Sequence, residues 1–165
     1  MNSACQHNLT EPTYFNNRGL SHFEREEFEQ ALVSYETAIQ LEIEKLKVEK
    51  DRSLENLSFY HKNLGLALYH QGEYGRALEE YQTAIGHNDA NADNYFNRGN
   101  VRLNEENFEL AHADFEAAIA REDRNAKFYH AKGLAYQAEA EKIAREPEPD
   151  RDLEAAKINN AIYYF

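Results

Sequence analysis

Small and aromatic residues recur along the chain at a helical spacing. In three stretches an alanine, an aromatic residue and a second alanine follow one another at steps of four and three. The three sets are Ala31, Tyr35 and Ala38; Ala77, Tyr81 and Ala84; and Ala111, Phe115 and Ala118. Residues three and four positions apart share one face of an α-helix. Each stretch therefore predicts a helix whose buried face carries a small, a large and a small residue.

A helix-like stretch that carries a glycine precedes each of these three, and a fourth such stretch follows the last of them. The glycines are Gly19, Gly65, Gly99 and Gly133. Gly65 to Gly99 and Gly99 to Gly133 each span 34 residues, whereas Gly19 to Gly65 spans 46. A glycine on one helix allows close approach of the aromatic residue on the next. The pattern predicts antiparallel helix pairs that stack and share a buried core.

A 34-residue period with an aromatic residue, glycine, alanine, an aromatic residue and alanine in that order resembles the tetratricopeptide repeat family. The resemblance implies an all-α, right-handed superhelical solenoid of about three and a half to four repeats. The repeats cover residues 12–45, 58–91, 92–125 and 126–165, after a flexible N-terminus at 1–11. Phe15, His61, Tyr95 and Tyr129 replace the family's tryptophan, and Asp89 and Asp123 replace its closing proline. Asn91 and Asn125 are predicted N-caps of the third and fourth repeats.

Two insertions interrupt the period, at 46–57 and at about 138–152. The first predicts a prolonged second helix and a turn near Asp51 to Ser53; alternatively, the long helix is a docking arm for a second partner. The other insertion predicts a helix that continues until Pro147 and Pro149 break it. The final stretch predicts the start of a fourth second helix, with an apolar edge uncapped at Phe165. We expect a longer protein, or another molecule that covers this edge.

The charge and composition of the chain limit the kinds of partner that it is expected to bind. Lys and Arg number 18 against 30 Asp and Glu, a net charge of -12, which repels nucleic-acid phosphate and anionic lipid. The single cysteine, Cys5, cannot form an intramolecular disulfide, and no apolar run is long enough for a membrane span. We expect a cytoplasmic protein, with association with the cytoskeleton or a cilium as an alternative, that binds no nucleic acid and does not insert into a membrane.

The resemblance implies that the first helices line a concave groove. Asn17, Asn63 and Asn97 each lie two residues before a repeat glycine. A primary amide has two donors and an acceptor, which suits the backbone of an extended peptide, so these residues predict a peptide-binding ladder. The alternative is that a wet groove needs polar residues whether or not it binds a ligand. Flanking positions on the same face are Asn16, Leu20, Glu24, Lys62, Leu66, His70, Phe96, Asn100, Asn104, Lys127 and His130.

One branch of the family grips a C-terminal carboxylate of chaperones with lysine, asparagine and arginine. Asn16 and Leu20 stand at the positions of its first Lys and Asn, and Asn97 at that of its Arg. A carboxylate clamp of the co-chaperone kind is therefore not expected, although Asn63 matches.

Catalytic and metal motifs are not found. The seven histidines include no HExxH pattern, and Gly72 to Gly75 lacks the length and the lysine of a nucleotide loop. We expect a protein that is not an enzyme and needs no cofactor or metal. The predicted function is a scaffold or adaptor that binds an extended peptide of a partner. The alternatives are a structural subunit that packs laterally in a cytoskeletal or ciliary complex, and a regulatory module of a longer enzyme.

Overall fold

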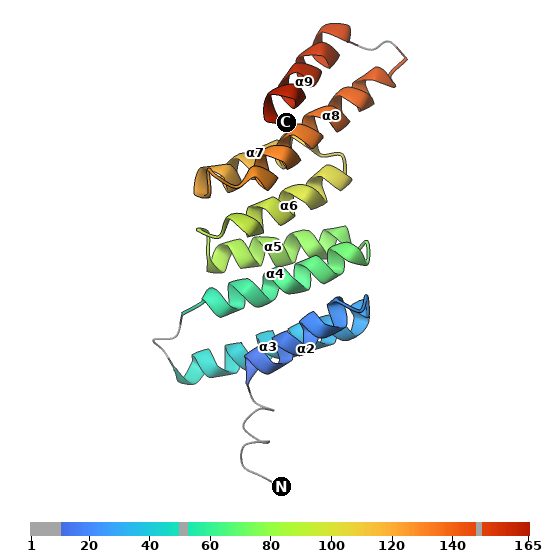
Figure 1. The fold of residues 1–165 in the computed structure, drawn as a ribbon. Coiled ribbons are helices and arrows are strands. Elements are labelled where there is room, and N and C mark those ends of the chain that lie inside the picture. The colour runs from blue at the N-terminus through green and yellow to red at the C-terminus, as the bar shows by residue number, and fades with distance from the viewer. Residues whose placement is uncertain (1–10, 50–52, 148–149) are drawn as a thin grey trace. The chain divides into compact units, whose positions relative to one another are not determined.

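The computed structural model describes residues 11–49, 53–147 and 150–165, and every regular element in these ranges is an α-helix. The helices are α2 (Pro12–Phe23), α3 (Phe28–Val48), α4 (Glu55–His70), α5 (Tyr74–His87), α6 (Ala92–Asn104), α7 (Phe108–Arg121), α8 (Ala126–Ala144) and α9 (Arg151–Tyr164) (Figure 1). The predicted all-α class is confirmed. The predicted flexible N-terminus, apart from Glu11, and the predicted turn at 51–52 lie outside the described residues.

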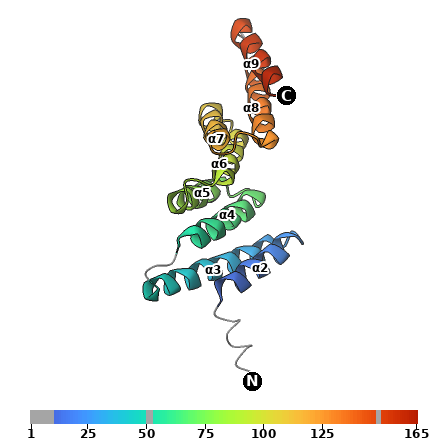
Figure 2. The ribbon, with the colours of Figure 1, turned by 60° about the vertical axis from the view of Figure 1, so that its left-hand side comes forward.

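The helices belong to two compact units, Met1–Asp89 and Ala90–Phe165. In the first unit α2 packs on α3, α4 on α5, and α3 on α4; in the second unit α6 packs on α7, α8 on α9, and α7 on α8. Contacts of α2 with α4 and of α6 with α8 place the first helices of neighbouring pairs side by side within each unit. Figures 1 and 2 show α8 and α9 packed against each other as the two helices of one pair. The predicted stacking of helix pairs is confirmed.

The predicted small, large and small positions form the core. All nine of these alanine and aromatic residues of α3, α5 and α7 have at most 1% of their surface exposed. The repeat glycines face the aromatic rings so closely that a side chain would collide. A Cβ atom would lie 2.6 Å from Tyr35 at Gly19, 2.9 Å from Tyr81 at Gly65, and 2.8 Å from Phe115 at Gly99.

Caps and turns follow from local chemistry. Asn91 accepts a hydrogen bond from the backbone of Asp93 at 3.0 Å, and Asn125 accepts one from the backbone of Lys127 at 3.3 Å. Both predicted N-caps are therefore confirmed. Between α4 and α5, Gly72 has a φ of 80°, the left-handed region that glycine enters at no steric cost.

The two insertions extend helices. α3 runs for 21 residues to Val48, beyond the end of the first predicted repeat. α8 ends at Ala144 before Pro147, and α9 begins after Asp150, whose side chain accepts a hydrogen bond from the backbone of Leu153. Within the described ranges no helix is long and apolar enough to cross a membrane. The repeat limits, and a single domain over 12–165, stay predictions.

Candidate binding surface on the first helices

In the first unit, two predicted groove amides bind each other. Asn63 of α4 is 6% exposed, and its Nδ2 donates a hydrogen bond of 2.8 Å to Oδ1 of Asn16 on α2, which is 3% exposed. Asn17, the neighbour of Asn16, is exposed. One amide of the predicted ladder is thus held inside the protein, where it joins α2 to α4, and another faces solvent.

The other predicted groove residues of this unit are more accessible. Leu20, Lys62 and Leu66 are half-buried, and Glu24 and His70 are exposed. The His70 ring stacks on Phe28 with centroids 5.6 Å apart, and Nζ of Lys62 lies 4.6 Å from the centre of the Phe59 ring. The His70 ring therefore makes an aromatic stack, and the Lys62 ammonium makes a cation–π contact, both of which are favourable.

In the second unit, α6 carries four predicted groove residues. Phe96, Asn97 and Asn100 are half-buried, and Asn104 is exposed. The ring of Phe96 lies 5.3 Å from that of Phe128 on α8. This contact fixes the aromatic ring, while the amides of α6 stay at the surface.

Lys127 and His130 lie on α8 and are both exposed. Nζ of Lys127 is 2.5 Å from a carboxylate oxygen of Asp93 on α6 and 5.0 Å from the centre of the Phe96 ring. The His130 ring lies 5.3 Å from that of Phe165. A hollow of about 620 Å³ adjoins these residues, lined by Ala126, Lys127, Tyr129, His130, Tyr164 and Phe165. The second unit therefore brings basic, amide and aromatic groups together at its surface.

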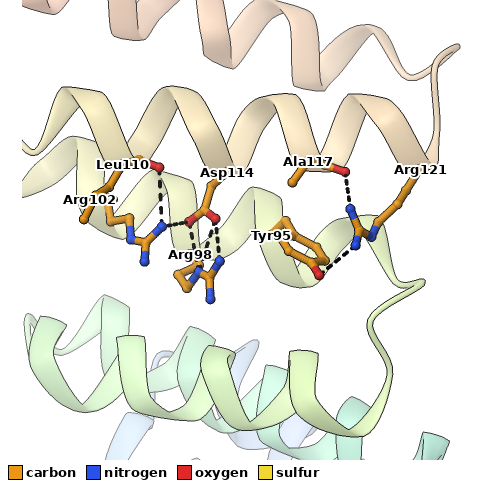
Figure 3. Close-up of polar contacts among 7 residues, drawn as sticks. All are labelled: Tyr95, Arg98, Arg102, Leu110, Asp114, Ala117 and Arg121. Atoms are coloured by element: carbon orange, nitrogen blue, oxygen red, sulfur yellow. Dashed lines mark hydrogen bonds and ion pairs between the residues drawn. The ribbon is translucent and has the colours of Figure 1, made fainter.

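The structure also shows a polar cluster that the sequence analysis missed. Asp114 of α7 is buried, with 3% of its side chain exposed, and accepts hydrogen bonds from two arginines of α6. Arg98 donates through Nη2 at 2.6 Å and through Nε at 3.0 Å, and Arg102 donates through Nη1 at 2.7 Å (Figure 3). Burial lowers the pKa of the Arg102 guanidinium, and the carboxylate of Asp114 opposes that shift. The negative charge of Asp114 therefore compensates the positive charges of Arg98 and Arg102, which are partly removed from water.

Figure 3 also shows the contact between Arg121 of α7 and Tyr95 of α6. Its Nη2 donates to the Tyr95 hydroxyl at 2.8 Å, and the guanidinium lies 3.9 Å from the centre of the ring. Nη1 donates to the carbonyl of Ala117 at 2.8 Å. Tyr95, which stands where the family has tryptophan, thus ties the two helices of this pair together.

Similar contacts occur in two other helix pairs. The residue before the repeat glycine is basic in three of the four pairs: Arg18, Arg98 and Lys132. Arg18 donates to Ser34 at 3.1 Å, and Nζ of Lys132 donates to Tyr164 at 2.9 Å. Burial acts to lower the pKa of Lys132, but its hydrogen bonds to Glu116 and Tyr164 outweigh burial, and the pKa is raised. A basic residue directly before a repeat glycine was therefore the feature of the sequence that could have indicated these contacts.

Among the residues that the structure describes, no group of three or more His, Cys, Asp or Glu side chains could hold a metal ion. What the first helices offer is a set of hydrogen-bonding amides, basic groups and aromatic rings. Such groups bind polar backbone and side chains, and they are common on surfaces that recognise proteins.

Comparison with known proteins identifies the repeat. Residues 65–105 match the family described as TPR repeat. MamA, 18% identical over 98% of this chain and 82% of its own, has a TM-score of 0.70. The Arabidopsis OM64 TPR domain, 20% identical over 78% of this chain and 96% of its own, has a TM-score of 0.67. Residues 65–105 therefore match a tetratricopeptide repeat, and the chain has the fold of tetratricopeptide-repeat domains, as predicted.

A third solved structure, YrrB, is described as a TPR protein with an unusual peptide-binding site. It is 19% identical, covers 98% of this chain and 90% of its own length, and has a TM-score of 0.50. No curated protein matches the sequence.

Proposed function

We propose that the protein is an interaction scaffold that binds an extended peptide segment of a partner protein on the inner faces of its first helices. The observation that carries the proposal is the surface of the second unit, where the half-buried amides Asn97 and Asn100 of α6 adjoin a helix that presents Lys127 and His130. A hollow of about 620 Å³ beside them can take a side chain of the peptide.

Two further facts support this proposal. The fold is that of tetratricopeptide-repeat domains, and YrrB, which shares the fold, is described as having a peptide-binding site. The exposed amide of Asn17 and the half-buried Leu66 offer similar chemistry in the first unit. A cytoplasmic location is part of the proposal, and it is supported by the acidic composition and the single cysteine.

The test is affinity purification from the native source with the full chain as bait. The double variant Asn97→Ala, Asn100→Ala is expected to recover the partner at least about tenfold less than the wild-type chain, because peptide hydrogen bonds are lost. Asn159 and Asn160 of α9 are exposed, and their alanine variants are the matched control. Asn63 is left unchanged because it joins two helices. Equal recovery by all three baits, with unchanged helical circular dichroism, would reject the proposed surface.

A second candidate function is lateral packing in a larger assembly, and one observation favours it. α9 and the residue after it expose large apolar side chains, from 44% to 82% of each surface: Leu153, Ile158, Ile162, Tyr163 and Phe165. Exposed apolar patches of this kind often mark sites of interaction with other proteins. Cross-linking of the native complex would place its partner either on α9 or on the first helices.

A further inference from the structure

The α2–α3 pair repeats the arrangement of Arg98 and Asp114 but lacks the carboxylate. Arg18 and Ser34 are separated by 16 residues on α2 and α3, just as Arg98 and Asp114 are on α6 and α7. Arg98 directs two nitrogens at the Asp114 carboxylate (Figure 3). Arg18 instead donates only its Nε, to a hydroxyl 3.1 Å away. The position that Asp114 fills in the second unit is therefore filled by a shorter, neutral side chain in the first.

The guanidinium of Arg18 is held in place with its terminal nitrogens available. The Ser34 hydroxyl accepts from Nε of Arg18 and itself donates to the carbonyl of Gln30 at 2.8 Å. The guanidinium also lies 4.8 Å from the centre of the Phe15 ring. Nη1 and Nη2 of Arg18 form no hydrogen bond or ion pair with the residues that the structure describes. A guanidinium fork of this kind matches the geometry of a carboxylate.

Space for a ligand lies beside this fork. A hollow of about 310 Å³ between α2 and α3 is lined by Arg18, His22, Glu29, Gln30, Val33 and Ser34, and we name it the α2–α3 hollow. His22 stands where the α6–α7 pair has Arg102, three residues after the repeat glycine. A second hollow of about 360 Å³ also includes Arg18 and His22 and adds Arg25.

The charge around this site is mixed, because Arg18 is a cation while Nδ1 of the His22 ring lies 2.6 Å from a carboxylate oxygen of Glu27. α2 contains no Asp or Glu, although the whole chain has a net charge of -12. Glu29 is the acidic residue that lines the α2–α3 hollow, and it is exposed. It disfavours a polyanion and favours a single acidic group with a neutral or basic neighbour.

We propose that the α2–α3 hollow binds a carboxylate of a partner protein. Nη1 and Nη2 of Arg18 hold the carboxylate, whereas Arg98 holds Asp114 through Nε and Nη2, because Nε of Arg18 already donates to Ser34. Val33, which is exposed, contacts the apolar part of the ligand. The α2–α3 hollow is lined by none of the residues proposed to bind the extended peptide. It adds a charged anchor on the first helix pair.

The proposal is tested by nuclear magnetic resonance on the full chain, with the Arg18 Nε–Hε and Ser34 amide signals observed at fixed ionic strength. The probe is N-acetyl-aspartate amide, which carries a side-chain carboxylate, and its neutral counterpart is N-acetyl-asparagine amide. N-acetylglycine tests a terminal carboxylate, and inorganic phosphate tests the alternative anion. Saturable shifts with the aspartate probe, and none with the asparagine probe, are expected. Tighter binding of phosphate than of either carboxylate would overturn the proposal.

The decisive variant is Ser34→Asp, which places the carboxylate of the second unit in the first. We expect it to fill the α2–α3 hollow from within, to raise the melting temperature, and to weaken probe binding at least about tenfold. Arg18→Gln, followed at the Ser34 amide, is expected to weaken binding equally if Ser34→Asp fails to fold. Arg145→Gln, an exposed arginine of the second unit, is the control and is expected to bind as the wild type does. No saturable shift up to roughly 100 mM probe, or equal binding by Ser34→Asp, would overturn the proposal.

Discussion

Asn63 on α4 and Asn16 on α2 are joined by a buried hydrogen bond of 2.8 Å between two first helices. The two residues are 47 positions apart, one more than the 46 that separate Gly19 from Gly65. The amide of one repeat therefore bonds to the position before its counterpart in the preceding repeat. This offset leaves Asn17 exposed and gives Asn63 a role in holding the helices together.

Replacing Asn63 with alanine is expected to destabilise the protein by about 1–3 kcal/mol, because the buried Oδ1 of Asn16 loses its donor. Asn17→Ala is expected to change stability by less than about 0.5 kcal/mol, since Asn17 is exposed. Urea unfolding followed by circular dichroism measures both variants. The double variant Asn16→Leu, Asn63→Leu removes both polar groups and is expected to recover most of the loss. A loss in Asn63→Ala no larger than in Asn17→Ala would contradict a structural role.

Gly99→Ala tests the close contact between first and second helices. A Cβ atom there would lie 2.8 Å from Phe115 and 3.2 Å from Asp114, so the ring must move within a packed core. We expect destabilisation of about 1–3 kcal/mol. Gly86→Ala in α5 is the control, because a Cβ at Gly86 meets nothing within 4 Å. Alanine favours the helix there by at most about 1 kcal/mol. Thermal unfolding compares the two, and equal melting temperatures would argue against the contact.

Asp114→Ala removes the shared partner of Arg98 and Arg102. Their side chains are 12% and 19% exposed, so both would be left partly desolvated without a carboxylate. Breaking such a pair is expected to cost about 2–4 kcal/mol in the free energy of unfolding. Asp93→Ala is the control, because its ion pair with Lys127 is exposed and is worth less than about 1 kcal/mol. If Asp114→Ala lost no more stability than Asp93→Ala, the two arginines would have to be solvated by water in place of the carboxylate.

The fold was predictable because its determinants are local and repeat with a fixed period. The glycine, alanine and aromatic positions predicted the helix pairs, and Asn91 and Asn125 predicted two caps from their own backbone neighbours. These features need only helical geometry and a period of 34 residues.

The polar contacts between helices were not predicted, for a physical reason. The bond between Asn63 and Asn16 depends on the axial shift of one helix against another, which the hydrophobic period does not specify. The bond between Arg98 and Asp114 joins positions 16 residues apart across a turn. Aligning the residues before each glycine and before each aromatic residue would have suggested it. Whether the predicted groove residues bind a peptide depends on a partner, and stays a prediction.

His112 predicts a dependence of stability on pH. It lies on α7, stacks on Tyr136 with ring centroids 3.9 Å apart, and contacts Glu139 at 3.1 Å. Burial lowers its pKa from the ordinary value of 6.5, and the hydrogen bond to Glu139 only partly opposes this shift. The two basic groups that face it, Lys157 and Lys132, lower its pKa further.

The sign follows from linkage. Because the folded-state pKa of His112 is below the unfolded value, the unfolded state binds more protons as the pH falls through about 6.5. The His112 contribution to stability is therefore intact above that pH and is lost below it, by at most about 1.4 kcal/mol per pH unit.

His112→Gln keeps a donor for Glu139 but does not titrate. The difference in unfolding free energy between pH 7.5 and pH 5.5 is expected to be smaller in His112→Gln than in the wild type. His130→Gln, at an exposed histidine of α8, is the control and should retain the wild-type difference. An unchanged difference in His112→Gln would mean that the carboxylates, and not this imidazole, set the response to acid.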